Sequence, residues 1–352
     1  MKKVLLGMSG GVDSTVSALL LKKNGFDVIG ITFIMTDAMS ESCGSGSAAA
    51  DAARAACEIG IPHISLDVRD RFRRNVIENF TAVYKSGGTP NPCVVCNRTM
   101  KFPEMLAYAD AHGIDYISTG HYAAITHDDR GYHLCAPHDA AKDQTYFLYT
   151  LTQSTLSRLI FPLAGLTKTE VRQIAAENGL SVAKKHDSQD ICFIPDGDYK
   201  AFIAKNTGEL PPPGEFTDSD GNILGRHTGI LNYTPGQRKG LGISAGRPLY
   251  VGSIDAARNR VILCDEDALY RSSVNISNVS FISGIPPREP FRAYVKTRYT
   301  RRCSMATVSP ADNDGTRYII DFDTPERAPA PGQSAVFYSD TELIGGGIIE
   351  KD

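Results

Sequence analysis

The chain has 352 residues, of which 42% are hydrophobic and 22% charged, and its formal net charge is −3. This composition excludes disordered and collagen-like proteins, and the length predicts two or three domains. Apolar runs are too short to span a membrane and the first residues turn polar too early for a signal peptide, so we expect a cytoplasmic protein with no membrane partner. Eight cysteines are too few for a disulfide scaffold, so any pairing is expected to be catalytic or metal-linked.

The first 200 residues alternate short β-branched runs with helical stretches, a pattern typical of a parallel sheet covered by helices on both faces. Strands are predicted at residues 3–7, 28–33, 63–68 and 114–118, and helices at residues 15–23, 47–58 and 102–112. A further helix is expected to begin with a capping box formed by Thr167 and Glu170, and to end at Asn178. This half of the chain is therefore predicted to be an α/β domain.

A rigid stretch at residues 211–214, three prolines and a glycine, interrupts this rhythm and predicts a domain boundary. Helical patterns are scarce beyond it. Alternating strands, such as those at residues 291–296, 334–338 and 342–349, predict a small antiparallel β-barrel at the end of the chain.

Charge is unevenly distributed along the chain. Between Arg226 and Arg302 there are thirteen Lys and Arg against five Asp and Glu, a local charge of +8, which leaves −11 for the rest. One region suited to neutralising phosphates is thus joined to an acidic remainder. A solvated surface without a polyanionic partner remains the alternative.

The first predicted strand runs directly into a glycine-rich turn followed by a helix. Converging backbone N–H groups and the helix N-terminus make such a turn an anion site. The turn lacks the Gly-Lys-Ser/Thr ending of a Walker A loop, and its glycine spacing does not match the dinucleotide-binding fingerprint. The alternative is a glycine-rich turn that binds no ligand. The turn is expected to hold phosphate, and its resemblance to the PP-loop of ATP pyrophosphatases implies that ATP binds on Gly7, Met8, Ser9, Gly10, Gly11, Val12, Asp13 and Ser14.

A metal-binding role and two further nucleotide contacts are predicted around this turn. Asp13 cannot lie bare beside a pyrophosphate, so we expect it to help hold Mg²⁺. Phe33, at the end of the second strand, and Gly120, after the strand at 114–118, are expected to line the adenine crevice at the carboxyl ends of the strands.

Two cysteine-containing segments lie far apart in the sequence. Asn91-Pro92-Cys93-Val94-Val95-Cys96-Asn97 contains one pair, and Cys192 follows almost a hundred residues later. A lone cysteine in an α/β domain is most often a small buried hydrophobe. Sequence order alone does not tell whether Cys192 meets Cys96 in space.

The run from Ser9 to Ser14 resembles the PP-loop of ATP pyrophosphatases, which cleave ATP between the α and β phosphates. Over nearly its whole length the chain resembles the tRNA-specific 2-thiouridylases of bacteria. The resemblance rests on the PP-loop, Asn-Pro-x-x-x-Cys-Asn, and residues 119–122, 142–149, 191–194, 236–242, 295–299 and 331–338.

This resemblance implies three domains. Residues 1–205 would form an adenine nucleotide α-hydrolase-like domain built on a parallel sheet, which carries the PP-loop and catalysis. Residues 206–272 would form a small central domain that contacts tRNA, and residues 273–352 a β-barrel similar to those of elongation factors.

The resemblance also implies a reaction on the wobble uridine, position 34, of the tRNAs for Lys, Glu and Gln. ATP adenylates the C2 oxygen, and sulfur then replaces it to give 2-thiouridine. Cys192 would carry a persulfide received from a sulfur-relay protein or a cysteine desulfurase, and Cys96 would attack it or act as acid/base, leaving a transient disulfide. Because thiolates are needed, neighbouring positive charge is expected to lower the thiol pKa.

Cys93 departs from the family, most members of which carry Asp at this position. Cys93, Cys96 and Cys192 would supply three thiolates for a [4Fe-4S] cluster with one open iron. The cluster, the persulfide route and an inert substitution at position 93 all remain open.

Contacts with the tRNA anticodon stem-loop follow from the same resemblance, since an unstacked base is read by its edge while phosphates set affinity. We expect them at Asn91, Pro92, Cys93, His121, Lys142, Asp143, Gln144, Arg298, Tyr299 and Gln333. Two other functions remain as alternatives: a PP-loop amidating or ligating enzyme acting on a small metabolite, and a non-catalytic iron–sulfur or RNA-binding carrier. ATP-to-AMP turnover that depends on tRNA would separate them.

Overall fold

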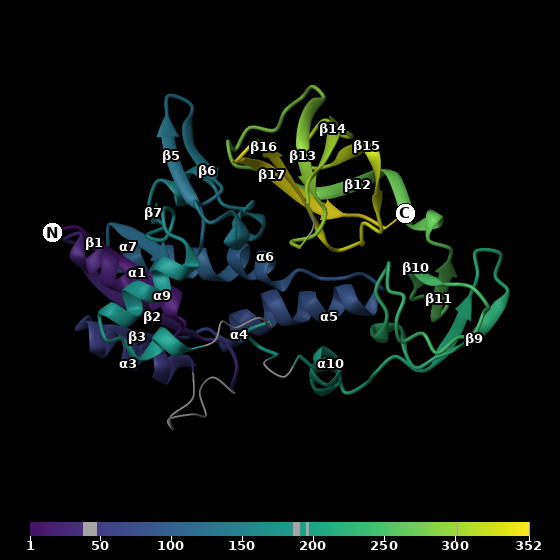
Figure 1. Cartoon of the computed structure of the whole chain (residues 1–352), viewed down its shortest axis with the longest axis horizontal. Helices are drawn as coiled ribbons and strands as arrows, with labels where there is room; N and C mark the ends of the chain where they lie inside the picture. Colours follow the sequence, from purple (N-terminus) through teal and green to yellow (C-terminus); the bar gives the residue numbers. More distant parts are fainter. Residues whose placement is uncertain (38–47, 186–190, 195–196, 301, 352) are drawn as a thin grey trace.

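The computed structural model describes residues 1–37, 48–185, 191–194, 197–300 and 302–351. Figure 1 shows a parallel-sheet domain at the N-terminal end, a barrel at the C-terminal end, and a small sheet between them in sequence. Within the described residues, no helix is long and apolar enough to cross a membrane.

The N-terminal domain is built on a five-stranded parallel sheet, as predicted, in the order β3-β2-β1-β4-β7. Its strands are β1 (Lys3–Gly7), β2 (Asp27–Ile34), β3 (His63–Asp67), β4 (Tyr116–Thr119) and β7 (Leu159–Ile160). The central strand β1 is buried on both faces, which explains its unbroken apolar sequence.

Helices cover both faces of this sheet. On one face lie α1 (Val12–Lys23), α3 (Ala48–Ile59) and α9 (Lys168–Glu177), whose apolar residues form one core with Val4 and Leu6 of β1. On the other face α7 (Phe102–Ala111) packs on Leu5 through Phe102 and Met105. The α/β prediction is confirmed; the predicted helix at 47–58 is α3, although Ser47 lies outside the described residues.

Local signals fixed several helix ends. The capping box is present: Thr167 Oγ1 accepts from the Glu170 N–H, while Glu170 accepts from the Thr167 N–H at 2.7 Å. Helix α1 begins at Val12, three residues before the predicted start, because Thr15 already donates its N–H to Gly11 O.

A long helical path leads from β3 towards the other domains. It consists of α4 (Arg69–Phe72), the π-helical η1 (Arg73–Ile77), α5 (Glu78–Lys85), α6 (Pro92–Cys96) and the π-helical η2 (Asn97–Lys101), which continues into α7. In Figure 1, α5 runs between the barrel and α10 (Tyr199–Thr207).

The C-terminal barrel has six antiparallel strands: β12 (Tyr270–Phe281), β13 (Phe291–Lys296), β14 (Ser304–Pro310), β15 (Tyr318–Arg327), β16 (Ser334–Ser339) and β17 (Glu342–Ile349). Pairing of β12 with β17 closes the sheet, which confirms the barrel prediction. Its interior is filled by residues such as Ile276, Tyr318 and Phe337.

A hairpin of the N-terminal half joins this barrel. Strands β5 (Ala124–Asp128) and β6 (Gly131–Cys135) extend the sheet from β17, where Leu134 lies opposite Leu343. This hairpin was not predicted from the sequence. The sheet therefore physically connects the parallel-sheet domain to the barrel.

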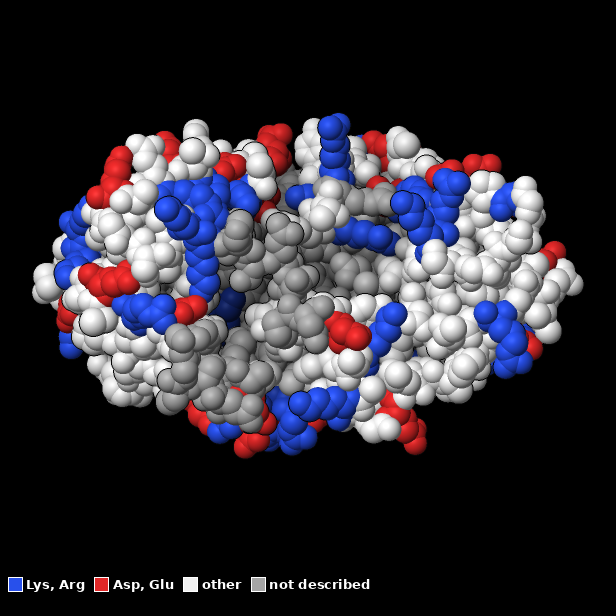
Figure 2. Space-filling model, turned by 60° about the horizontal axis from the view of Figure 1, so that its bottom comes forward, with Lys and Arg blue, Asp and Glu red and all other residues white. Residues whose placement is uncertain are grey.

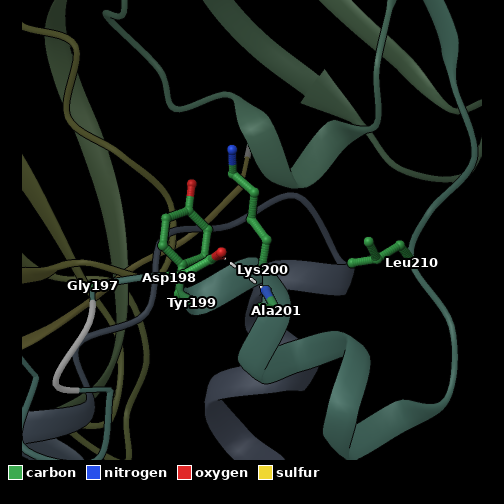
Figure 3. A pocket seen from close by; sticks show the side chains of 6 residues that line it. All are labelled: Gly197, Asp198, Tyr199, Lys200, Ala201 and Leu210. Carbon is green, nitrogen blue, oxygen red and sulfur yellow. Dashed lines mark hydrogen bonds between the residues drawn. The ribbon is translucent and has the colours of Figure 1, made fainter.

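The central domain contains a four-stranded sheet in the order β10-β11-β8-β9, formed by β8 (Gly214–Thr217), β9 (Ile223–His227), β10 (Tyr250–Asp255) and β11 (Arg260–Cys264). Phe216, Val251 and Val261 fill its core. Helix α10 precedes it and is capped by Asp198, which accepts from the Ala201 N–H at 3.0 Å beside an open pocket that also exposes Lys200 and Leu210 (Figure 3).

Candidate active site

The turn between β1 and α1 has the shape of an anion cradle. Gly10 adopts φ +70°, and a Cβ there would lie 2.6 Å from Asp51 Cβ, so only glycine fits. Ser14 Oγ accepts from the Ser9 N–H and donates to Gly11 O, both at 3.2 Å. These contacts fold the turn over the start of α1, where helix N–H groups favour an anion.

Two neighbouring strands support this turn. Thr32 Oγ1 of β2 donates to Met8 O at 2.7 Å and also contacts His63 Nε2 at 2.9 Å. After β4, Gly120 lies against α1 so closely that a Cβ would meet Ser14 N at 2.8 Å. Gly120 thus lies beside the turn, and Phe33 is half-buried at the end of β2.

Asp13 is already neutralised by groups that the sequence analysis missed. Lys168 Nζ lies 2.8 Å from both carboxylate oxygens, and the Tyr122 hydroxyl donates to Oδ1 at 2.9 Å. Lys168 is the first residue of α9, so the capping box that was recognised in the sequence also fixes this lysine. Nothing local pointed to Asp13 as its partner, 155 positions away.

A second lysine contacts the same turn. Lys185 Nζ donates to Gly10 O at 2.9 Å and pairs with Asp51 at 2.6 Å. The turn is therefore flanked by two ammonium groups, which increases its suitability for a polyphosphate.

Helix α6 presents the first cysteine pair. Asn91 is its N-cap and accepts from the Val94 N–H at 3.4 Å, and Pro92 occupies the first turn, where its missing N–H costs nothing. Cys93 is exposed and Cys96 is partly exposed. After α6 the helix widens into η2, a form that is frequent at functional sites.

Cys192 lies in the same neighbourhood. Cys96 packs against an apolar cluster that includes both neighbours of Cys192, Ile191 and Phe193. The charges of Cys93 and Cys96 both act on Cys192, and Lys101 acts on all three thiols. The structure therefore brings the two distant cysteine segments together.

The thiols are not activated as the sequence analysis expected. Cys93 and Cys192 reach solvent on one side, but dense protein surrounds them elsewhere, and this desolvation raises the pKa of all three thiols. For Cys192 desolvation, followed by the charges of Cys96 and Cys93, raises the pKa to about 12. Lys101 lowers the thiol pKa values but does not outweigh burial, so the expectation of lowered values was wrong.

These thiols do not assemble into a metal site. Among the described residues, which include Cys93, Cys96 and Cys192, no group of three or more His, Cys, Asp or Glu is placed to hold a metal ion. A [4Fe-4S] cluster, one of the three alternatives that the sequence left open, needs three converging thiolates, and these residues are not placed in that way in this structure.

Four of the tRNA contacts predicted in the N-terminal domain follow β4 in the sequence. His121 stacks near Phe102 and bonds to Thr119 Oγ1 at 2.8 Å; burial lowers its pKa well below the usual value, so it is neutral. Gln144 accepts from the Tyr122 N–H at 3.0 Å. Asp143 accepts from Thr145, and Lys142 ends the 3₁₀ turn η3 (Ala140–Lys142).

The barrel residues predicted for RNA contact have partners within the chain. Arg298 donates to Pro235 O at 3.0 Å and Ala328 O at 2.8 Å, bridging the central domain and the barrel. Tyr299 is 36% exposed and lies beside Phe147, with ring centroids 4.6 Å apart. Gln333 donates through its side-chain amide to Thr89 O and Pro90 O, in the segment before α6. Lys and Arg side chains border a central hollow on the face shown in Figure 2.

Family models match all three parts of the chain. A "tRNA methyl transferase HUP domain" matches residues 2–196, a "tRNA methyl transferase PRC-barrel domain" residues 200–265, and an "aminomethyltransferase beta-barrel domain" residues 271–349. Among solved structures, a 4-thiouridine synthetase in complex with RNA and ATP is similar over 59% of this chain and 50% of that chain, with 17% identity and a TM-score of 0.39.

Curated relatives match over almost their full length. The tRNA-specific 2-thiouridylase MnmA of Acetivibrio thermocellus is 47% identical over an alignment of 358 residues that covers 99% of both chains. MnmA 1 of Clostridium botulinum strain Loch Maree is 46% identical, again with 99% of both chains covered. The chain belongs to the family of tRNA-specific 2-thiouridylases.

Proposed function

We propose that this protein replaces the C2 oxygen of the wobble uridine in tRNA with sulfur, in a reaction driven by ATP. The observation that carries the proposal is the meeting of Cys96 with the segment of Cys192 at the carboxyl-terminal side of the sheet that also holds the phosphate turn. Membership of the 2-thiouridylase family supports the same conclusion. The tRNAs for Lys, Glu and Gln are the proposed substrates.

The phosphate turn would bind ATP and orient its α-phosphorus. The N–H groups at the start of α1, from Val12 to Ser14, would face the phosphates, and Gly120 and Phe33 would border the crevice for the nucleoside. Oxygen ligands suit Mg²⁺, which needs only one or two carboxylates when phosphates supply the rest. Asp13 would hold this ion once Lys168 releases it, and Mg²⁺ would supply neutralisation of the pyrophosphate leaving group.

Adenylation makes the uridine oxygen a leaving group. The C2 oxygen attacks the α-phosphorus, the bond to the β-phosphate breaks, and pyrophosphate leaves. Asn91, Pro92 and Cys93 at the start of α6 would lie against the unstacked base, with His121 and residues 142–144 beside them. Arg298 and Tyr299 would approach the anticodon stem-loop from the barrel.

Sulfur transfer then uses the two distant cysteines. The terminal sulfur of a Cys192 persulfide, loaded by a sulfur-relay protein or a cysteine desulfurase, bonds to C2 as AMP leaves. Cys96 then attacks Cys192 Sγ, which breaks the bond between that sulfur and the transferred sulfur, releases 2-thiouridine and forms a Cys96–Cys192 disulfide. An external dithiol reduces this disulfide before the next turnover. Because the resting thiols are protonated, binding of the activated tRNA must supply the conditions for deprotonation.

The test combines tRNA-dependent AMP formation with nucleoside mass spectrometry. Wild-type protein given ATP, Mg²⁺, tRNA and a persulfide donor should form AMP and 2-thiouridine together. Cys192→Ser should abolish 2-thiouridine while the tRNA-dependent release of pyrophosphate, which precedes sulfur transfer, persists. AMP formation that ignores tRNA but follows a small amine would instead establish an amidating enzyme, and no turnover of ATP under any condition would establish a carrier.

A further inference from the structure

One turn of the barrel lies directly on the segment that leads into α6. The Thr89 N–H donates to Pro331 O at 2.7 Å. A Cβ on Gly332 would lie 3.0 Å from Thr89 O and 2.8 Å from Val83 Cγ1, so the two backbones are packed as closely as glycine permits. The barrel thus touches the chain within a few residues of Asn91.

Gln333 fixes this contact with its amide. Its Nε2 donates to Thr89 O and to Pro90 O, both at 3.0 Å, so the two amide hydrogens are both used inside the protein. Pro90 is buried, and its carbonyl precedes the N-cap of α6. Gln333 therefore joins the barrel to the residues that set where α6 starts.

A second set of hydrogen bonds, through Tyr146, also joins the barrel to Asn91. The Tyr146 hydroxyl donates to Ser334 O at 2.9 Å and also bonds with the Asn91 side chain. Tyr146 is completely buried, and Ser334 Oγ contacts the Tyr149 hydroxyl at 3.2 Å. Asn91 is thus held between the barrel and the helix that it caps.

We propose that Gln333 is a positioning residue for the cysteine helix α6, and that the barrel turn 331–334 sets the placement of Cys93 and Cys96. The inference rests on the proposed function only for its effect on turnover; the positioning itself is a property of the free protein. Gln333 was predicted from the sequence to bind tRNA, but the donors that such a contact would use point at Thr89 and Pro90.

Gln333 can influence Cys96 because the segment between Pro90 and Cys96 is short and helical. From Pro90 to Cys96 the chain consists of one residue, Asn91, and a helix of five residues, so a shift at Pro90 is carried to Cys96 by a rigid element. Productive sulfur transfer requires placement of reacting groups to within a fraction of an ångström, and small displacements there reduce rates strongly. Losing the two hydrogen bonds should therefore change the reactivity of Cys96 without any contact to RNA.

The experiment compares Gln333→Met with wild type by three measurements. Site-resolved alkylation with iodoacetamide, read by peptide mass spectrometry, reports the placement of Cys93 and Cys96 in the free protein. A filter-binding Kd reports tRNA affinity, and thiolation kinetics separate kcat from KM. We expect the Cys96 alkylation rate to change by about threefold to tenfold and kcat to fall, with Kd for tRNA unchanged.

Further variants keep the test decisive. Gln333→Lys keeps hydrogen-bond donors at the end of the side chain and should bring the Cys96 alkylation rate back toward the wild-type value. Tyr146→Phe removes the second tether and should alter Cys96 in the same sense. Gln173→Met, on the exposed surface of α9, is the matched control and should change nothing.

Two results would overturn the proposal. One is a weaker tRNA Kd for Gln333→Met with Cys96 alkylation unaltered, which would make Gln333 a direct RNA contact. The other is unaltered alkylation in both Gln333→Met and Tyr146→Phe. Because alkylation is measured without ATP or tRNA, failure of the thiolation reaction would leave this result readable and would count against the proposed function alone.

Discussion

Lys168 forms an ion pair with the carboxylate of Asp13, and its Nζ lies 2.8 Å from both carboxylate oxygens. Only 12% of the lysine side chain is exposed. The pair joins the first residue of α9 to the phosphate turn. An ion pair this sheltered leaves a poorly solvated charge behind when one partner is removed.

Lys168→Met should therefore destabilise the protein by about 2 kcal/mol, since hydrogen bonds to charged groups contribute about 1.5–3 kcal/mol. Urea denaturation measures this difference. Lys168→Arg keeps a cation at the site and should recover most of the loss. In a double-mutant cycle with Asp13→Asn the combined loss should be smaller than the sum of the two, and simple additivity would show that the pair does not interact in solution.

The ion pair between Lys168 and Asp13 also predicts how the protein binds divalent cations. In the free protein, Lys168 competes with any metal ion for Asp13. Lys168→Met should thus bind Mn²⁺ more tightly than wild type when no nucleotide is present, as measured by electron paramagnetic resonance. Asp13→Asn should abolish the gain. Equal Mn²⁺ affinity in wild type and Lys168→Met would contradict the exchange of Lys168 for the metal.

A side chain at position 120 is expected to disturb the phosphate turn and to leave the rest of the fold intact. A Cβ there would meet Ser14 N at 2.8 Å and Asp13 C at 3.0 Å, both backbone atoms that cannot move aside cheaply. Gly120→Ala should weaken ATP binding at least tenfold in equilibrium dialysis. Gly165→Ala is the control, because a Cβ at Gly165 meets nothing within 4 Å, and it should bind ATP normally. Normal ATP affinity in Gly120→Ala would show that the turn adapts or lies elsewhere.

Much of the parallel-sheet domain could be predicted because its signals are local. The apolar run of β1, the glycine turn and the Thr167 capping box each depend on neighbours in sequence. The β-barrel was predicted for a similar reason, since polar and apolar residues alternate along its strands. The pairing of β6 with β17, which connects the two domains, could not be predicted, because the two strands lie some 200 positions apart in the sequence.

The candidate site shows the same division. Its motifs marked Cys96, Cys192 and the phosphate turn, yet no local pattern identified Lys168 as the partner of Asp13. Thiol pKa values also escaped prediction, because they depend on how densely other segments surround Cys192 rather than on its neighbours in sequence. Long-range packing therefore decides the chemistry of residues that sequence motifs can only locate.

The hairpin that joins the barrel carries a histidine between two carboxylates. His133 Nδ1 lies 2.6 Å from Glu342 of β17, and its Nε2 lies 2.8 Å from Asp128 of β5. Glu342 first and Asp128 second raise the pKa of His133, against a smaller opposing effect of burial. Arg130 also pairs with Asp128, so one cation remains on that carboxylate at any pH near neutrality.

A histidine whose pKa is higher in the folded than in the unfolded protein stabilises the fold fully below its unfolded pKa of about 6.5. That contribution is lost as the pH rises through the raised folded value. The stability difference between wild type and His133→Gln should therefore be larger at pH 6 than at pH 9, as measured by urea denaturation at both values. His127→Gln, which removes a neighbouring ring that lies tilted against Tyr132, should give the same difference at both pH values. A pH-independent penalty for His133→Gln would mean that packing, rather than the two ion pairs, holds the hairpin against β17.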